Sequence, residues 1–221
     1  MYGMIKFEDY EIRKETQYSK LSYYYKQKKI NEEELKKIVE TKFLNNLKNL
    51  FENNEIIVSQ FYNEDIIEIK VPENIKKINE KAFSKCKKLK NVILPQNIKS
   101  IKEGTFYYCE NLIDINIPQN VETIEREAFG GCEKISQINI PNSVVNIEAG
   151  AFEDCNSIKE ITIPKTTINI REGVFAPCHQ LEKIIVDKNN PVYDSRNNCN
   201  AIIETDTNTL LQGCKNTIIP E

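Results

Sequence analysis

Two consecutive stretches of equal length decide the fold: residues 112–134, LIDINIPQNVETIEREAFGGCEK, and residues 135–157, ISQINIPNSVVNIEAGAFEDCNS. Aligned without a gap, they share most of their aliphatic positions, a proline, an Ala-Phe pair and a cysteine. The same 23-residue interval runs along most of the chain as three columns. These columns are Phe83, Phe106, Phe129, Phe152 and Phe175; Cys86, Cys109, Cys132, Cys155 and Cys178; and Pro72, Pro95, Pro118, Pro141 and Pro164. A fixed period of this size predicts a solenoid, in which each coil buries its apolar side against its neighbours.

Each repeat contains one short alternation of aliphatic and outward-facing residues. It reads Ile115-x-Ile117 in one repeat and Ile138-x-Ile140 in the next, and a proline follows directly. Alternation with a period of two is typical of a half-buried strand, and proline ends a strand because it has no N–H for the ladder. The aliphatic residues after the proline then turn the chain back, and phenylalanine fills the widest part of the coil.

This pattern resembles the BspA-type leucine-rich repeats, whose unit reads LxxLxLPxxLxxIxxxAFxxCxx. The match covers roughly residues 66–221, and Thr167, Val174 and Asp187 depart from it. The positions that carry it are Leu112, Ile115, Ile117, Pro118, Val121, Ile124, Ala128, Phe129 and Cys132, with their equivalents every 23 residues. The resemblance implies a solenoid with a parallel strand sheet on one side and a protein-interaction role, often at microbial surfaces.

The predicted fold class is an α+β repeat protein: a leucine-rich-repeat solenoid with a parallel β-sheet face, an N-terminal helical cap and a C-terminal irregular repeat that contains a β-hairpin. Residues 1–55 are the predicted helical region. Asn31, followed three residues later by Glu34, forms a capping-box pattern, and apolar residues then recur at helical spacing. We expect residues 32–52 to form an amphipathic helix over the first coil, or alternatively a separate partner-binding arm.

Residues 56–221 are the predicted solenoid. Residues 56–64 read as a degenerate first coil, regular repeats run from about 66 to 186, an irregular repeat spans 187–216, and a further repeat begins at 217–221. Within the irregular repeat, Ala201–Thr205 and Thr209–Leu211 read as hairpin strands joined by Asp206-Thr207-Asn208. An end coil without a polar cap indicates truncation or a covering partner, so end-to-end self-association is expected if the chain is truncated.

Composition narrows the classes of partner and the location. Charged residues are 29% of the chain, hydrophobic residues are 40%, and the net charge of -3 argues against a nucleic-acid binder. No apolar run approaches the ~20 residues that span a bilayer, so membrane insertion is not expected. Residues 1–10 lack the pattern of a secretory signal. The chain as written is therefore expected in the cytoplasm, and at the cell surface or secreted if it is part of a longer exported protein.

No residue pattern points to catalysis, to a metal or to a cofactor. The single histidine, His179, follows Cys178, and neighbouring residues of an extended segment point to opposite faces, so they cannot converge as a nucleophile and its base. The other cysteines of the column recur too far apart for the short spacings of a zinc site. Because one column points one way, we expect its thiols to be buried and reduced and not paired in disulfides.

The outward positions of the predicted strands are the candidate binding surface. Asparagine and glutamine side chains at its centre can both donate and accept hydrogen bonds. The surface is either simply solvated or a partner-binding face, since solenoids use their extended sheets in this way. The predicted partner-binding residues are Asn91, Ile93, Asp114, Asn116, Gln137, Asn139, Glu160 and Thr162.

Two functions from different classes fit these observations. The leading one is a non-catalytic module that binds a protein or glycan partner through the strand face, in microbial surface adhesion. The alternative is an intracellular scaffold or effector, in which the N-terminal helices bind one partner and the solenoid binds another. An enzyme is the least supported class.

Overall fold

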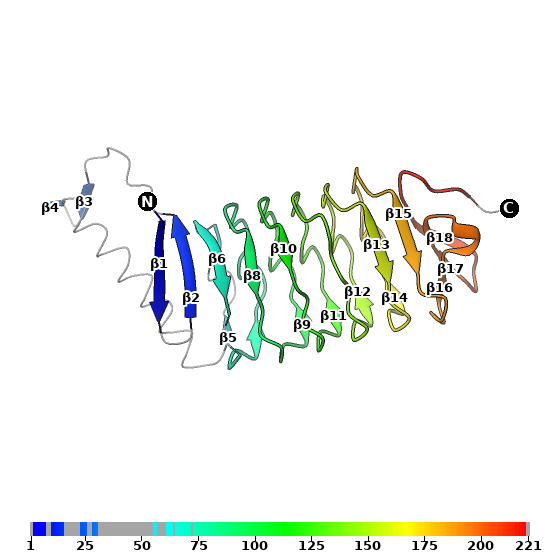
Figure 1. Ribbon diagram of the computed structural model, residues 1–221, viewed down its shortest axis with the longest axis horizontal. Helices are drawn as coiled ribbons and strands as arrows, with labels where there is room; N and C mark the ends of the chain where they lie inside the picture. The colour runs from blue at the N-terminus through cyan, green and yellow to red at the C-terminus, as the bar shows by residue number, and fades with distance from the viewer. Residues whose placement is uncertain are drawn as a thin grey trace.

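The structure is a computed structural model that describes the backbone of residues 2–7, 10–15, 23–25 and 28–30, and residues 55–56, 61–63, 65–71 and 73–219 in full. The coils stack side by side along the long axis of the molecule, with the N-terminal strands at the left and the C-terminal hairpin at the right (Figure 1). The described residues contain no α-helix, and none of their helical segments could cross a membrane.

The alternating segments of the repeats form parallel strands, which pair in two separate groups. Strands β6 (Ile66–Lys70), β8 (Asn91–Ile93) and β10 (Asp114–Ile115) lie side by side, with each residue opposite the one that follows it by 23 positions. Further along, β13 (Glu160–Ile163) pairs with β15 (Lys183–Val186) in the same register. The alternating pattern therefore forms the strands that it predicts, because aliphatic residues at every second position have a core to face.

A second row of short parallel strands forms where each coil turns back. It contains β9 (Ser100–Ile101), β11 (Thr123–Ile124), β12 (Asn146–Ile147) and β14 (Asn169–Ile170), and the pair β5 (Glu55–Ile56) and β7 (Lys77–Ile78) precedes it. The repeat pattern indicates only a turn at these positions. Because these coils have equal length, the two equivalent residues of each turn lie in register with those of the next coil. Their backbones therefore pair as a ladder of short parallel strands.

The phenylalanine column forms the centre of the core. Six rings stack along the solenoid, with centroids 5.2 Å apart between Phe61 and Phe83 and 5.5 Å apart between Phe106 and Phe129. Phe61 is 2% exposed and Phe129 is fully buried. Phe61 continues the column into residues 56–64, the predicted degenerate first coil. Each of the four inner rings stacks on the rings of both neighbouring coils, so the stack ties the coils together.

The cysteine column has a structural reason of its own. Each thiol donates a hydrogen bond to the carbonyl of a phenylalanine in the preceding coil, for example from Cys109 to Phe83 at 3.1 Å and from Cys132 to Phe106 at 3.2 Å. All seven cysteines are free. Cysteine is small and apolar but can still satisfy a buried carbonyl, which explains its recurrence at this position.

The turns between coils need left-handed backbone at two further columns. Positive φ occurs at one column of residues on the turn side and again four residues further on, at Tyr108 and Gly131 among others. The first column is Lys81, Gly104, Glu127, Gly150 and Gly173. Glycine adopts this conformation without the steric cost of a side chain, and so it recurs here.

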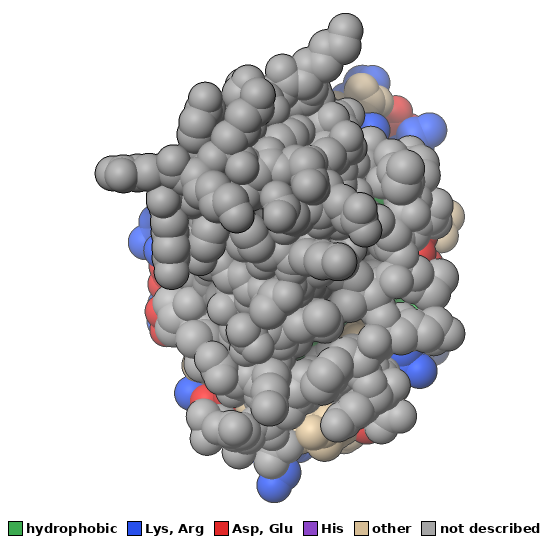
Figure 2. Space-filling view, turned by 90° about the vertical axis from the view of Figure 1, so that its left-hand side faces the viewer, with side chains coloured by type: hydrophobic (Ala, Val, Ile, Leu, Met, Phe, Trp, Pro, Cys, Tyr) green, Lys and Arg blue, Asp and Glu red, His purple; other side chains and the backbone are tan. Residues whose placement is uncertain are grey.

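Charged side chains join neighbouring coils on the outside. Lys88 pairs with Asp65 at 3.2 Å, Lys99 with Glu122 at 2.8 Å and Lys183 with Glu160 at 3.1 Å. In each pair the partners are 23 residues apart, so they occupy the same position in successive coils. In the view from the left-hand end, the described side chains at the margins are largely of these charged types (Figure 2). Each exposed pair contributes at most about 1 kcal/mol.

The N-terminal region corrects the predicted fold class. Residues 1–55 are not a helical cap in their described parts, because β1 (Tyr2–Phe7) and β2 (Tyr10–Glu15) form an antiparallel hairpin, and β3 (Tyr23–Tyr25) pairs with β4 (Lys28–Ile30). Strand β2 pairs antiparallel with β6 and extends the sheet of the solenoid. A strand satisfies the open backbone groups of a sheet edge, which a helix cannot do. The predicted helix at 32–52 lies outside the described residues. The fold is a β-solenoid and not an α+β protein.

The C-terminal irregular repeat contains the predicted hairpin. Strand β17 (Ala201–Glu204) pairs antiparallel with β18 (Thr209–Gly213), and β16 (Tyr193–Asp194) pairs with β17 on its other side. A single 3-10 turn (Arg196–Asn198) lies between β16 and β17. The Tyr193 hydroxyl accepts a hydrogen bond from the backbone N–H of Ile170 at 3.0 Å, which ties this unit to the last regular coils.

Candidate functional site

The candidate site is the strand face, defined here as the outward side chains of β6, β8, β10, β13 and β15 and of residues 137–140, which occupy the same place in the coil between β10 and β13. Burial alternates along each segment: Val92 and Ile115 are buried, whereas their neighbours Asn91, Ile93 and Asn116 are exposed. The predicted partner-binding residues are all exposed, as the period-two pattern requires. Exposure places them at the surface and does not by itself identify a partner.

Side chains at the two ends of the strand face bind each other across the coils. Asn91 donates to Glu68 at 3.1 Å in the first part, and Lys183 pairs with Glu160 at 3.1 Å in the last. Among the described residues, the side chains of Asp114, Asn116, Gln137 and Asn139 make no such bond. The centre of the face therefore holds hydrogen-bonding groups that are available to a partner.

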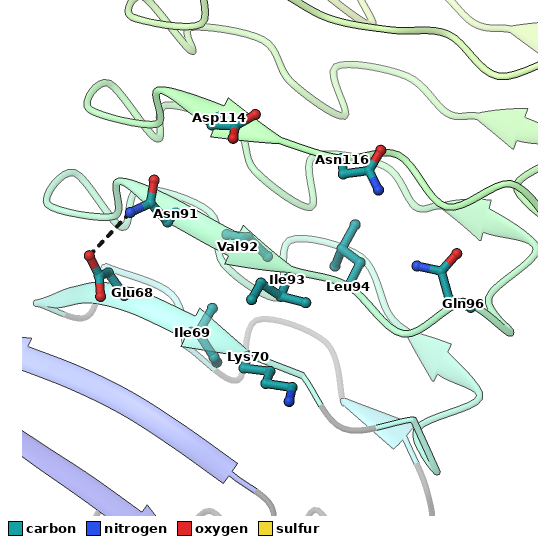
Figure 3. Close-up of a pocket in the computed structure, with 10 residues that line it drawn as sticks. All are labelled: Glu68, Ile69, Lys70, Asn91, Val92, Ile93, Leu94, Gln96, Asp114 and Asn116. Carbon is teal, nitrogen blue, oxygen red and sulfur yellow. Dashed lines mark hydrogen bonds between the residues drawn. The ribbon is translucent and has the colours of Figure 1, made fainter.

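A hollow of about 600 Å³ lies over β6, β8 and β10 (Figure 3). Ile69, Val92 and Leu94 also line it, although their side chains are buried in the core. Ile93 is 57% exposed, an unusual side chain for a polar face. The carboxylates and Asn91 lie at the amino ends of the strands, and Lys70, Asn116 and Gln96 lie toward the carboxyl ends (Figure 3).

A second hollow, of about 580 Å³, lies where the sheet is interrupted. Residues 136–140 are not part of a strand, and among the described residues no backbone hydrogen bond joins them to the coils on either side. The return turn of the same coil still pairs on both sides through β12. Ile138 and Ile140 remain buried, so the core is intact while the backbone polar groups of residues 136–140 bond to no other described coil.

The thiols of the cysteine column are held in their protonated form. Burial raises the pKa of the Cys109, Cys132 and Cys155 thiols well above the usual value, and it raises the pKa of Cys178 to about 12. Thiols held protonated in this way are poor nucleophiles. No group of metal-ligating side chains gathers among the described residues. The backbone N–H of His179 donates to Asn156, as expected for a structural turn.

Sequence reasoning located the outward positions and missed two features of the site. The two hollows are also lined by residues outside the predicted partner-binding set, namely Lys70, Gln96, Ser136 and Lys159. The interruption at residues 136–140 has no sequence signal, because Gln137-Ile138-Asn139-Ile140 repeats the pattern of the paired strands. It arises from how neighbouring coils sit against each other.

The family model for the BspA type leucine rich repeat region, with six copies, matches residues 54–182 and 99–205. These ranges cover more than half of the chain. The chain belongs to the BspA-type leucine-rich repeat family. The resemblance that the repeat unit predicts is thereby confirmed.

Solved structures of bacterial leucine-rich repeat proteins are similar to this chain. The T. pallidum leucine rich repeat protein TpLRR is 27% identical, with a TM-score of 0.52 over 53% of this chain and 57% of that one. A leucine-rich repeat protein from Bacteroides ovatus is 28% identical, with a TM-score of 0.50 over 55% of this chain and 36% of that one.

A leucine rich cell surface protein from Faecalibacterium prausnitzii is 25% identical to this chain, with a TM-score of 0.57 over 72% of this chain and 49% of that one. The chain therefore spans between about a third and three fifths of the lengths of these three relatives. A search of curated proteins finds no significant match.

Proposed function

We propose that the chain is a non-catalytic interaction module that binds a protein or glycan partner through its strand face and acts in adhesion at a microbial surface. The observation that carries the proposal is the unbonded centre of the strand face, where Asp114, Asn116, Gln137 and Asn139 are exposed and make no side-chain bond to another described residue. Membership in a repeat family of this type supports an interaction role.

The strand face also has the rigidity that binding needs. Its side chains stand on a solenoid whose core is a continuous stack of buried rings, and the ladder of return strands crosses every coil from β9 to β14. A partner that lies across several coils would therefore lose little of its binding energy to ordering of the protein. Amide side chains on such a scaffold can donate and accept at fixed positions.

The adhesion part of the proposal is supported by one relative. The F. prausnitzii protein that shares this fold is described as a cell surface protein, and the present chain spans about half of it. A partner on the outside of a cell is the corresponding expectation here. It is checked by displaying the chain on beads and measuring their retention on host cells and on purified extracellular glycoproteins.

The strand face itself is tested by a double variant, Asn116→Arg with Asn139→Arg. Both side chains are exposed, so the change adds bulk and positive charge and leaves the core untouched. We expect the unfolding midpoint to change little and retention of the beads to be lost. The matched control is Ala149→Arg with Glu172→Gln, which makes the same net charge change at exposed positions outside the strand face.

Two results would overturn the proposal. One is retention that survives in the double variant and is lost in the control, because the partner would then bind the turns. The other is turnover of a bound substrate by the wild-type protein, because the module would then be an enzyme.

A further inference from the structure

The hollow over β6, β8 and β10 narrows the chemistry of the partner, on the assumption that the strand face is the binding surface. Its decisive charged group is Asp114. This side chain is exposed, and its carboxylate has no ion pair or hydrogen bond within the described part of the chain. The neighbours at the same position in the adjacent coils are Asn91 and Gln137, which carry no charge to balance it.

Several other carboxylates of the solenoid pair with a lysine of a neighbouring coil. Glu160, at the same position of the repeat as Asp114, pairs with Lys183. At other positions of the repeat, Glu122 pairs with Lys99 and Glu125 pairs with Lys102. The backbone carbonyl of Lys90, in the preceding coil, accepts from the N–H of Ile113 beside Asp114, and no ion pair joins Lys90 to Asp114 in the described residues. A cation from outside the chain is therefore the complement that Asp114 fits, since charge complementarity sets which partner approaches a surface.

The second decisive group is Ile93. It is 57% exposed at the centre of the hollow (Figure 3). An aliphatic side chain from a partner would cover it and remove both from water. None of the described lining residues is aromatic. A polypeptide supplies aliphatic and cationic side chains together, whereas a neutral sugar supplies neither.

The register of the sheet sets the spacing between the two groups. Asp114 lies opposite Asn91, and Ile93 is two residues beyond Asn91 on the same strand. In an extended chain, alternate side chains lie on the same side and are roughly 7 Å apart. A partner strand over the groove between β8 and β10 therefore places one side chain on Asp114 and the next-but-one on Ile93. Lys70 flanks Ile93 and disfavours a second cation there.

We propose that this hollow binds an extended polypeptide segment in which a lysine or arginine is separated by one residue from an aliphatic side chain. The cation pairs with Asp114, and the aliphatic side chain covers Ile93. The backbone of the segment lies along β8 and β10, where Asn116 and Asn91 can donate to it or accept from it. Binding requires no covalent step.

The test uses phage-displayed random dodecapeptides selected on the immobilised full chain. We expect enriched clones to share a basic residue two positions from a leucine, isoleucine or valine. A synthetic peptide with the enriched sequence should bind Asp114→Lys about ten-fold more weakly, because attraction becomes repulsion. Ile93→Ser should weaken the same peptide, and the matched control Glu172→Lys, an exposed charge reversal outside the strand face, should leave its Kd unchanged.

Several results would overturn the inference. They are no enrichment of any clone, enriched clones without this spacing, an unchanged Kd for Asp114→Lys, or binding of glycans and no peptides. Peptides that lack the spacing but lose binding to the Asn116→Arg and Asn139→Arg double variant would overturn the inference and leave the proposed function standing. Peptides that still bind the double variant but do not bind the Ala149→Arg with Glu172→Gln control would count against both the inference and the proposed function.

Discussion

At the scale of single residues, the buried phenylalanine column carries the stability of the solenoid. The ring of Phe129 is fully buried and lies 5.5 Å from the ring of Phe106 and 5.4 Å from that of Phe152. Phe129→Ala should lower the free energy of unfolding by ~3–5 kcal/mol, because it removes the buried ring and leaves a cavity between two coils. Urea denaturation followed by circular dichroism measures the change.

The control for Phe129 is Ile93→Ala, which truncates an exposed aliphatic side chain and should change the unfolding free energy by at most about 0.5 kcal/mol. Equal losses in the two variants would contradict the assignment of the phenylalanine column to the core.

Two glycines with left-handed backbone, Gly131 and Gly173, allow backbone strain to be separated from steric crowding in the turns. Gly131 has φ +72°, and a Cβ there would lie 2.8 Å from the ring of Tyr108, whereas Gly173 has φ +70° and nothing within 4 Å. Gly173→Ala should cost only the backbone strain of about 1–2 kcal/mol. Gly131→Ala should cost about 1–3 kcal/mol more, because the methyl group also displaces the ring. Thermal unfolding that ranks the two in the opposite order would exclude this account of the turns.

The buried thiols make stability depend on alkaline pH. Burial raises the pKa of Cys178 to about 12, whereas an unfolded thiol loses its proton near pH 8.5. Between these values the unfolded state binds fewer protons than the folded state, so the unfolding free energy falls as pH rises. We expect a loss of about 1 kcal/mol per pH unit for this thiol.

The measurement is urea denaturation at several pH values between neutral and strongly alkaline. Cys178→Ala should make the decline shallower than in the wild-type protein, because the lysines and tyrosines titrate equally in both proteins. Parallel declines in the two proteins would show that Cys178 ionises freely in the folded state.

At the scale of elements, the first strand of the solenoid is covered by a strand and not by a helix. Strand β2 pairs with β6 from Glu11 opposite Lys70 to Lys14 opposite Ile66, with one register shift. Deleting residues 1–15 should leave the backbone groups of β6 open, which favours pairing between molecules. Light scattering should then show self-association and calorimetry a lower Tm. A monomeric deletion variant with an unchanged Tm would show that β2 is dispensable.

The sequence predicts the elements that follow the repeat and not those that depend on contacts between coils. The recurrence of Phe129 and Cys132 every 23 residues predicts which residues are buried, because the regular coils all have the same length. The second ladder, such as Thr123–Ile124 against Asn146–Ile147, requires the coils to be stacked first. The N-terminal strands depend on the open edge of β6, which lies far away in the sequence.

The candidate site divides in the same way. The outward direction of Asn116 and Asn139 can be predicted from the alternation of aliphatic and polar residues, which a single repeat already contains. The loss of strand pairing at residues 136–140 cannot be predicted from the sequence, since these residues match those of paired segments. The absence of a partner for Asp114 also depends on which residues of adjacent coils come opposite it.

At the scale of the whole molecule, the packing that stabilises the solenoid lies apart from the strand face that we propose as the binding surface. The ring stack and the return ladder run the length of the regular coils, so the strand face can lose its own pairing at one coil without loss of the core. In a repeat protein, stability is close to a sum over coils and their interfaces. The unbonded groups at the centre of the strand face are therefore free to serve a partner.

The central claim is that a partner binds the strand face. Its most direct test is hydrogen–deuterium exchange of the protein, measured alone and in complex with a glycoprotein or peptide found in the binding experiments. The account predicts slower exchange in the complex at residues 91–93, 114–116 and 137–140, which lie on or beside the centre of the strand face. It predicts no change at the turns that contain Lys81, Gly104 and Glu127. Protection confined to those turns, with unchanged exchange on the strand face, would contradict it.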